Sequence, residues 1–271
     1  GLMAAGAAGK AGDVFGAFIT NPVQVVAYQL IFMVATIWIV YKGVGEGIEK
    51  YCKIMMPALF LILAILIVRA VTLPGAGKGF EFYLKPDFAK LTGKAVFAAL
   101  GQAFFSLSLG MGCMITYGSY LNKKEVLPSA AVTVAFLDTA VAFLAGFAIF
   151  PAVFAFNIEP GAGPGLTFVT LPNVFAQMPG GMFFSFLFFL LLFFAALTSS
   201  VSLLEVCVAY FKDEMGWSRE KASWLLGGVI TALGVPSALS LGGKFPKIAG
   251  KDFLDAMDFI SSNVLLPLGG I

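Results

Sequence analysis

The sequence predicts an all-α, polytopic membrane protein. Hydrophobic residues make up 59% of its 271 residues and charged residues 12%, whereas a soluble domain carries about 25% charged residues. The mean hydropathy is +0.94. Apolar segments of helix length follow one another, without the strand-length alternation of an outer-membrane barrel. The chain is therefore expected to cross a bilayer several times as helices.

Seven apolar segments account for most of the chain, and a bilayer crossing needs about 20 residues. The predicted spans are residues 23–41, 55–73, 95–121, 127–156, 181–210, 218–241 and 253–271. Residues 1–22 are Ala/Gly-rich and are interpreted as a loop or as the tail of another helix. Because the last span looks cut short, we expect residues 1–271 to be one transmembrane domain of a longer protein.

The connections justify these boundaries in order. The first span follows Asn21-Pro22, and the sixth begins near Ser218, a residue suited to start a helix. The connecting segments are residues 41–56, 74–94, 122–125, 157–180, 211–221 and 242–252. Lys and Arg are divided almost evenly between the two sets of loops, so the positive-inside rule does not orient the chain. Loop length places the short charged loops together on one side.

Several function classes are disfavoured by what the sequence lacks. It has no His, which removes the most common general base and metal ligand. Cys52, Cys113 and Cys207 are too widely spaced for a metal motif and are interpreted as reduced. No HExxH, G-x-S-x-G or Walker motif is present, and the net charge of +2 does not suggest nucleic-acid binding. The chain is therefore predicted to be neither an enzyme nor dependent on a cofactor.

Ionisable residues inside the spans are candidates for function, because burying a charge in a membrane is costly. Asp138 lies near the middle of the fourth span and Glu205 well inside the fifth. The alternative for Asp138 is a carboxyl group that a neighbouring helix satisfies. Arg69, Asp255 and Asp258 lie near span ends, where interfacial anchoring is the simpler interpretation.

Two clusters of small and hydroxylated residues stand out. In the third span, two glycines and two serines lie within residues 101–113; they favour close helix packing, with an interruption of the helix as the alternative. In the fifth span, Thr198 and Ser199 either pack against a helix or supply oxygen ligands to sodium. Together with Asp138, these clusters indicate an ion-coupled transporter.

The motif GQAFFSLSLGMG, which starts at Gly101, resembles the sixth helix of the neurotransmitter:sodium symporter family, in its bacterial amino-acid, leucine-transporter-like branch. Further matches follow the order of that family. They are Gly47 and Pro57 with the Gly-x₉-Pro spacing of the fifth helix, Thr170 to Gly181 of the fourth extracellular loop, Leu197 to Ser200 of the eighth helix, and Leu254 to Asp258 of the tenth.

The resemblance implies a leucine-transporter-like inverted-repeat fold, of which this chain holds helices four to ten. Residues 1–22 would then be an extracellular loop. The implied protein is a multi-pass transporter of the plasma (inner) membrane. It would couple sodium entry to amino-acid uptake by alternating access, and this fragment alone is expected to be inactive. Its implied partners are an amino-acid substrate, sodium and the lipid bilayer.

The resemblance also implies functional residues. Those expected to bind the substrate are Phe105, Ser106, Ser108, Met111 and Leu203. Those expected to bind sodium are Ser106, Asp138, Ala195, Thr198 and Ser199, with Ala195 acting through its carbonyl. Asp258 would belong to the extracellular gate.

Two departures from the family pattern refine this prediction. Asp138 stands where relatives usually have Asn, and Ala142 stands where chloride-dependent members have Ser. We expect Asp138 to supply the compensating negative charge, so that chloride is not required. Met111 stands where relatives often have an aromatic residue and should make the pocket more adaptable; the expected substrate is a hydrophobic or aromatic amino acid. The alternative function is a non-transporting membrane sensor or scaffold with the same fold; an intramembrane enzyme is a distant third.

Overall fold

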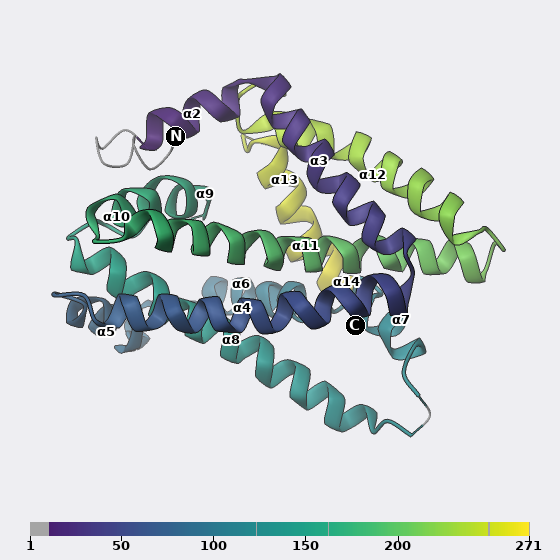
Figure 1. Ribbon diagram of the computed structural model, residues 1–271, viewed down its shortest axis with the longest axis horizontal. Helices are drawn as coiled ribbons and strands as arrows, with labels where there is room; N and C mark the ends of the chain where they lie inside the picture. Colours follow the sequence, from purple (N-terminus) through teal and green to yellow (C-terminus); the bar gives the residue numbers. More distant parts are fainter. Residues whose placement is uncertain (1–10, 123, 162, 249, 271) are drawn as a thin grey trace. The chain divides into compact units, whose positions relative to one another are not determined.

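The computed structural model describes residues 11–122, 124–161, 163–248 and 250–270, apart from the side chain of Lys90, and these residues are helical with short connections (Figure 1). The chain forms two units. The first unit comprises residues 1–18, 54–89 and 139–195, and the second comprises residues 19–53, 90–138 and 196–271. The boundaries between the two units fall within α2, α4, η2, α8 and α11, and each unit is described by itself.

The helical elements up to the middle of the chain are α2 (Ala11–Thr20), α3 (Pro22–Tyr41), η1 (Val44–Glu49), α4 (Lys50–Val71), α5 (Gly77–Leu84), η2 (Phe88–Lys90), α6 (Gly93–Ser106), α7 (Cys113–Ser119) and α8 (Leu127–Ala155). The later elements are α9 (Gly163–Gly165), η3 (Leu166–Thr170), α10 (Leu171–Gln177), α11 (Gly181–Asp213), α12 (Arg219–Ser240), α13 (Phe253–Ile260), η4 (Ser261–Leu265) and α14 (Leu266–Gly270).

Five helical stretches of the described chain are long and apolar enough to cross a membrane: Pro22–Tyr41, Val44–Val71, Leu127–Ala155, Gly181–Asp213 and Arg219–Ser240. The other two predicted spans are not single α-helices. The third is divided into α6 and α7, and the seventh consists of α13, the π-helical η4 and α14. The predicted alternative of an interrupted third span is therefore what the structure contains.

In the second unit, α3 and α12 lie side by side (Figure 1). Each starts with a side-chain cap: Asn21 accepts a hydrogen bond from the N–H of Gln24, and Ser218 accepts one from the N–H of Lys221, both at 3.3 Å. Between the two helices, the Gln29 amide donates to the Thr231 carbonyl at 3.0 Å. Polar contacts thus join these otherwise apolar helices.

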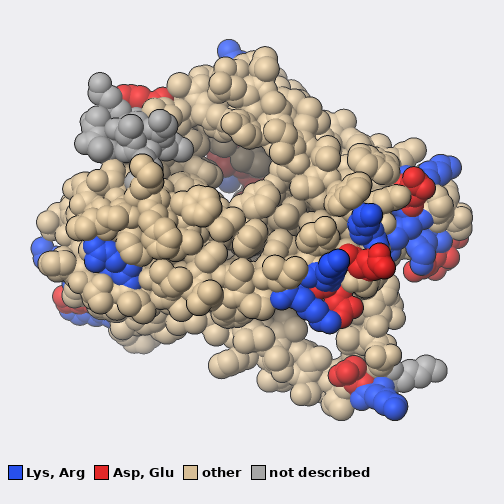
Figure 2. All heavy atoms as spheres, in the orientation of Figure 1, with Lys and Arg blue, Asp and Glu red and all other residues tan. Residues whose placement is uncertain are grey.

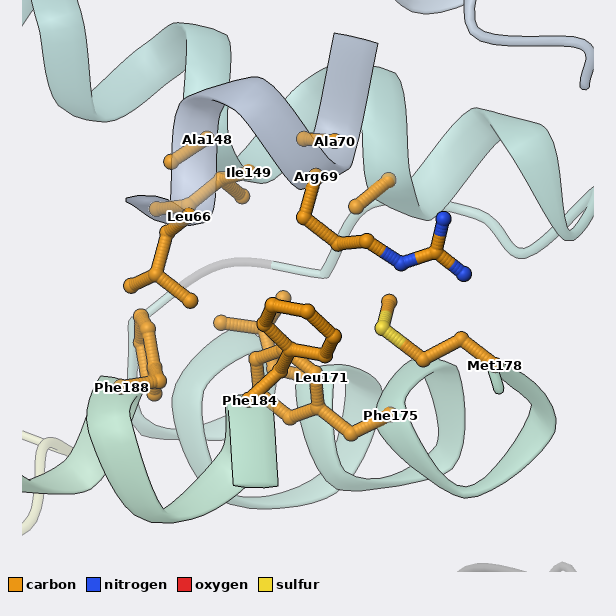
Figure 3. Close-up of a pocket in the computed structure, with 11 residues that line it drawn as sticks. Leu66, Arg69, Ala70, Ala148, Ile149, Leu171, Phe175, Met178, Phe184 and Phe188 are labelled. Atoms are coloured by element: carbon orange, nitrogen blue, oxygen red, sulfur yellow. The ribbon is translucent and has the colours of Figure 1, made fainter. Parts of the chain in front are cut away.

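The core of the first unit is apolar. Buried side chains from α4, α8, α10 and α11 form one cluster: Ile62, Leu66, Ala70, Leu73, Ala152, Val153, Leu171, Val174, Phe175, Met178 and Phe188. Helix α10 contributes to it although its residues lie in a predicted loop. The guanidinium of Arg69 is at the edge of the cluster, 5.6 Å from the centre of the Phe184 ring (Figure 3). This position agrees with a charged side chain that anchors the end of a span.

Helix α5 also lies within a predicted loop, and its packing on α8 explains why it forms. The ring of Tyr83 occupies the space beside Gly146, where an added Cβ would come within 2.1 Å of the ring. The Tyr83 hydroxyl donates to the Phe143 carbonyl at 3.0 Å. Surface charge is sparse on the face shown in Figure 2, where charged side chains gather in separate groups on an otherwise uncharged surface.

Candidate functional site

The interruption between α6 and α7 begins with a Schellman cap. The N–H of Leu109 donates to the Phe104 carbonyl at 2.9 Å, and the N–H of Ser108 donates to the Phe105 carbonyl at 3.1 Å. Ser108 has a left-handed backbone with φ 54°. This pair of hydrogen bonds ends the helix at Ser106 and satisfies the carbonyls of its last turn.

Two glycines carry the chain from this cap into α7. Gly112 has φ 82° and precedes the first residue of α7, while Gly110 has φ 75°. A Cβ on Gly110 would lie 2.3 Å from the Leu266 carbonyl oxygen. The interrupted segment therefore passes too close to α14 for a side chain at position 110. Another residue there would also be strained, because its backbone would have to adopt the positive φ of Gly110.

A cavity of ≈ 210 Å³ opens beside the interruption. Its lining comes from α6, the interruption, α7 and α11, all within the second unit: Phe105, Ser106, Ser108, Met111, Cys113, Thr198, Ser199, Ser202 and Leu203. All five residues predicted to bind the substrate are among them, and so are three predicted sodium ligands, namely Ser106, which was predicted for both roles, Thr198 and Ser199. Residues about 90 positions apart in the sequence thus line one space.

Ser106 also joins the cavity to Asp138. Its hydroxyl oxygen lies 2.7 Å and 2.8 Å from the two carboxylate oxygens of Asp138, to which it donates. Asp138 itself is partly exposed in the second unit and does not line the cavity. The structure therefore brings these two predicted sodium ligands into direct contact, as oxygen donors of the kind that hard cations prefer.

The two remaining predicted residues lie elsewhere. Ala195 precedes Thr198 and Ser199 by about one turn of α11, which is the spacing of residues on the same face of a helix. Ala195 belongs to the first unit, however. Asp258 is exposed on α13 and accepts a hydrogen bond from the Ser262 hydroxyl at 3.2 Å. Neither residue is among those that line the cavity.

The sequence analysis did not identify Ser202, a polar residue that lines the cavity. Ser202 accepts a hydrogen bond from the Tyr117 hydroxyl at 2.7 Å and donates to the Thr198 carbonyl at 3.0 Å. Cys113 lies against the Ser202 carbonyl at 3.8 Å. The spacing of four residues from Thr198 could have placed Ser202 on the same face of the helix, whereas its contact with α7 had no sequence signal.

Glu205, which the sequence marked as an ionisable residue inside a span without identifying a partner, is the centre of a buried network in the second unit. Its carboxylate is fully buried, forms an ion pair with Arg219 and accepts a hydrogen bond from the Tyr120 hydroxyl at 2.6 Å. The Arg219 Nε–H also donates to the Val40 carbonyl at 2.8 Å. One carboxylate therefore ties the ends of α3, α7 and α12 to α11.

Most of the chain matches a known family. A sequence model of the Sodium:neurotransmitter symporter family matches residues 18–263. The chain belongs to this family. Because the family consists of transporters, the exclusion of an enzyme is confirmed, and so is an integral, multi-pass membrane location.

Two bacterial relatives of this symporter-family chain give the extent of the match. An uncharacterized sodium-dependent transporter of Bacillus subtilis (YhdH) is 44% identical over 261 residues, which are 96% of this chain and 58% of the relative. One from Haemophilus influenzae is 44% identical over 250 residues, covering 92% of this chain and 55% of the relative. The chain thus spans little more than half the length of these relatives.

A solved structure confirms the fold. The crystal structure of MhsT in complex with L-phenylalanine is 51% identical and superposes with a TM-score of 0.88 over 96% of this chain and 60% of MhsT. The prediction of an all-α, leucine-transporter-like fold, present in part, is therefore confirmed. Helices α5 and α10 are additions to the seven predicted spans.

Proposed function

We propose that this chain forms helices four to ten of a sodium-coupled symporter for hydrophobic or aromatic amino acids. The observation that carries this proposal is the cavity in which the α6–α7 interruption faces Thr198 and Ser199 of α11. Interrupted helices place backbone and hydroxyl oxygens at the depth where substrates and coupling ions bind. Membership of a sodium symporter family supports the same activity.

The proposal includes two sodium sites, which the contacts of their oxygen donors support. Ser106 and Asp138, whose side chains are in contact, would contribute to the first site. Ala195, Thr198 and Ser199 would contribute to the second. Within the described residues, no group of three His, Cys, Asp or Glu residues could hold a metal ion. Hydroxyl, carbonyl and single carboxylate oxygens are ligands suited to sodium rather than to a transition metal.

The substrate would bind in the same cavity. Phe105, Met111 and Leu203 supply apolar surface to its lining, and Ser106 and Ser108 supply hydroxyls. The complex of MhsT with L-phenylalanine supports an aromatic amino acid for this chain as well. Met111 is flexible and polarizable, so it can adapt to side chains of different size.

Asp258 is proposed to act in the extracellular gate.

Uptake by the full-length transporter that contains these residues tests the proposal. In proteoliposomes, sodium-dependent uptake of labelled L-phenylalanine is expected. The double substitution Thr198→Ala with Ser199→Ala removes two oxygen donors, so the sodium concentration for half-maximal uptake should rise about tenfold or more. Ser200→Ala is the matched control, because Ser200 is next in α11 but its hydroxyl faces Thr36 at 2.8 Å.

An unchanged sodium response in the double variant would contradict the assigned site. Binding of L-phenylalanine without uptake would instead favour a membrane sensor or scaffold with the same fold. The 271-residue chain alone is expected not to transport, and sodium-dependent binding of L-phenylalanine by that isolated chain would contradict this expectation.

Chloride independence is a separate part of the proposal. The Asp138 carboxylate places a negative charge beside Ser106, and Ala142, one turn later in α8, has no hydroxyl to hold chloride. Uptake should therefore be equal in chloride and in gluconate. A strict requirement for chloride would show that Asp138 does not supply the compensating charge.

A further inference from the structure

Ser108 occupies a backbone position that usually belongs to glycine. It is the residue after the helix end in the Schellman cap of α6, where the chain must adopt a left-handed conformation. Its φ is 54°, and the next two left-handed residues of the interruption, at 110 and 112, are glycines. Only at Ser108 does a Cβ approach the following carbonyl oxygen, which makes this conformation unfavourable for ordinary residues.

The end of α8 provides an internal reference. There Asn157 has φ 52° and donates to the Phe154 carbonyl at 3.1 Å, while Ile158 donates to the Val153 carbonyl at 3.3 Å. These two bonds form the same cap. Asn adopts the left-handed conformation more readily than Ser, and the Asn157 amide oxygen accepts a hydrogen bond from Lys78 at 3.3 Å. The cap of α8 therefore has a residue type that suits its left-handed backbone, and the side chain of that residue accepts a hydrogen bond.

The cap of α6 lacks both of these compensations. The Ser108 side chain lines the cavity, and its hydroxyl makes no hydrogen bond within the described part of the chain. Glycine at this position would remove the steric conflict and serine retains it, so the side chain must be needed for something other than folding. The cavity beside the interruption is the space that this side chain lines.

We propose that Ser108 is a strained positioning residue that couples the α6–α7 interruption to occupancy of the cavity. Its left-handed backbone holds the interruption at an energetic cost, and a ligand that contacts its hydroxyl offsets this cost. The last turn of α6 is then ordered when the cavity is filled and opens more readily when it is empty. This inference rests on the proposed function in taking the cavity as the substrate site.

Two substitutions separate the backbone from the hydroxyl. S108A and S108G both remove the hydroxyl, but only S108G removes the conflict at the left-handed position. Hydrogen exchange of residues 103–112 in the full-length, ligand-free transporter measures how often the cap opens. The amides in S108G should exchange about tenfold more slowly than those in S108A, from the usual cost of a left-handed non-glycine residue. S108N should be intermediate.

Addition of sodium chloride and L-phenylalanine as the probe tests the coupling. Exchange in residues 103–112 should slow most in the wild type and least in S108G, where the cap is already closed without ligand. N157G and N157A serve as matched controls at the α8 cap and should leave this segment unchanged. If S108G does not fold, the comparison of S108N with S108A carries the same expectation.

Equal exchange of S108G and S108A without ligand would overturn the role of strain. Identical exchange of the wild type with and without sodium and L-phenylalanine, in a preparation that takes up L-phenylalanine, would overturn the coupling. Failure of the proposed function is distinguishable, because it would appear as absent sodium-dependent uptake by the wild type. The ligand-free comparison does not depend on that activity.

Discussion

In the first unit the buried cluster consists of aliphatic, aromatic and methionine side chains from α4, α8, α10 and α11, whereas the second unit buries a carboxylate, several hydroxyls and an interrupted helix. Buried polar residues of the second unit are Thr36, Glu205, Ser223, Thr231 and Ser240, and those of the first unit are Thr170 and Ser185. Among the described residues, only the second unit, which contains the interrupted helix, buries a charged side chain. The two interiors therefore differ in buried charge and in the number of buried hydroxyls.

The two interiors should respond differently to substitution. Apolar packing tolerates a change of shape at constant volume, whereas a buried charge tolerates no loss of its partner. Substitutions of matched burial in the two units can therefore break or sharpen the comparison.

The largest effect is expected from Arg219→Ala in the second unit. This change leaves the Glu205 carboxylate, 0% exposed, without its ion-pair partner, which should lower the free energy of unfolding by about 4 kcal/mol. Thermal or denaturant unfolding in detergent measures it. Lys53→Ala breaks an exposed ion pair with Glu49 and is the control, with an expected loss of about 0.5 kcal/mol. Equal losses in the two variants would remove the contrast between buried and exposed pairs.

A somewhat smaller effect is expected from Leu171→Ala in the first unit. Leu171 is 2% exposed in the apolar cluster, and the lost contacts and the cavity left behind should lower the free energy of unfolding by about 3 kcal/mol. Leu171→Met conserves volume and should reduce that free energy by about 1 kcal/mol or less. If Leu171→Met were as damaging as Leu171→Ala, the first unit would be as intolerant as the second. The same unfolding measurements apply.

The smallest effect is expected at the hydroxyl pair between α3 and α11. The hydroxyls of Thr36 and Ser200 lie 2.8 Å apart, and each also has a carbonyl oxygen of its own helix within hydrogen-bond distance, so one hydroxyl donates across the pair while the other donates to its own helix. Because the hydroxyl that remains after Thr36→Val or Ser200→Ala can still donate to its own helix, each substitution should lower the free energy of unfolding by about 1 kcal/mol. A double-mutant cycle should give a coupling of about 0.5 kcal/mol or more. Strict additivity would indicate that the two hydroxyls act independently.

The sequence predicted the continuous spans well, because long apolar segments in a membrane have few alternatives to helix. The glycines and serines near Ser106 favoured close helix packing, with the observed interruption as the alternative, and the resemblance to the family turned the prediction toward the interruption. Helix α5 was missed because its residues, GKGFEFYL, have no capping signal and form a helix through packing of Tyr83 on α8. Helix α10 had a usable signal in Pro172, which lies in its first turn.

The candidate site was predictable only in part. Resemblance to a family placed Ser106 and Asp138 together across 32 positions, which periodicity alone does not provide. The pairing of Glu205 with Arg219 depends on the turn between α11 and α12, and the contact of Tyr117 with Ser202 depends on the orientation of α7 after the interruption. Such pairs are set by tertiary geometry rather than by local sequence.

Because Tyr83 packs beside Gly146, the docking of α5 on α8 depends on whether the phenol of Tyr83 is protonated. Burial raises the pKa of Tyr83 above its ordinary value of 10.0, so the folded state favours the neutral phenol. The stabilisation that comes from this difference is fully present below the unfolded pKa, and it is lost as the pH rises through the folded pKa. Docking of α5 on α8 should therefore be insensitive to pH across the neutral range and weaken in alkaline solution, where the hydroxyl can no longer donate to Phe143.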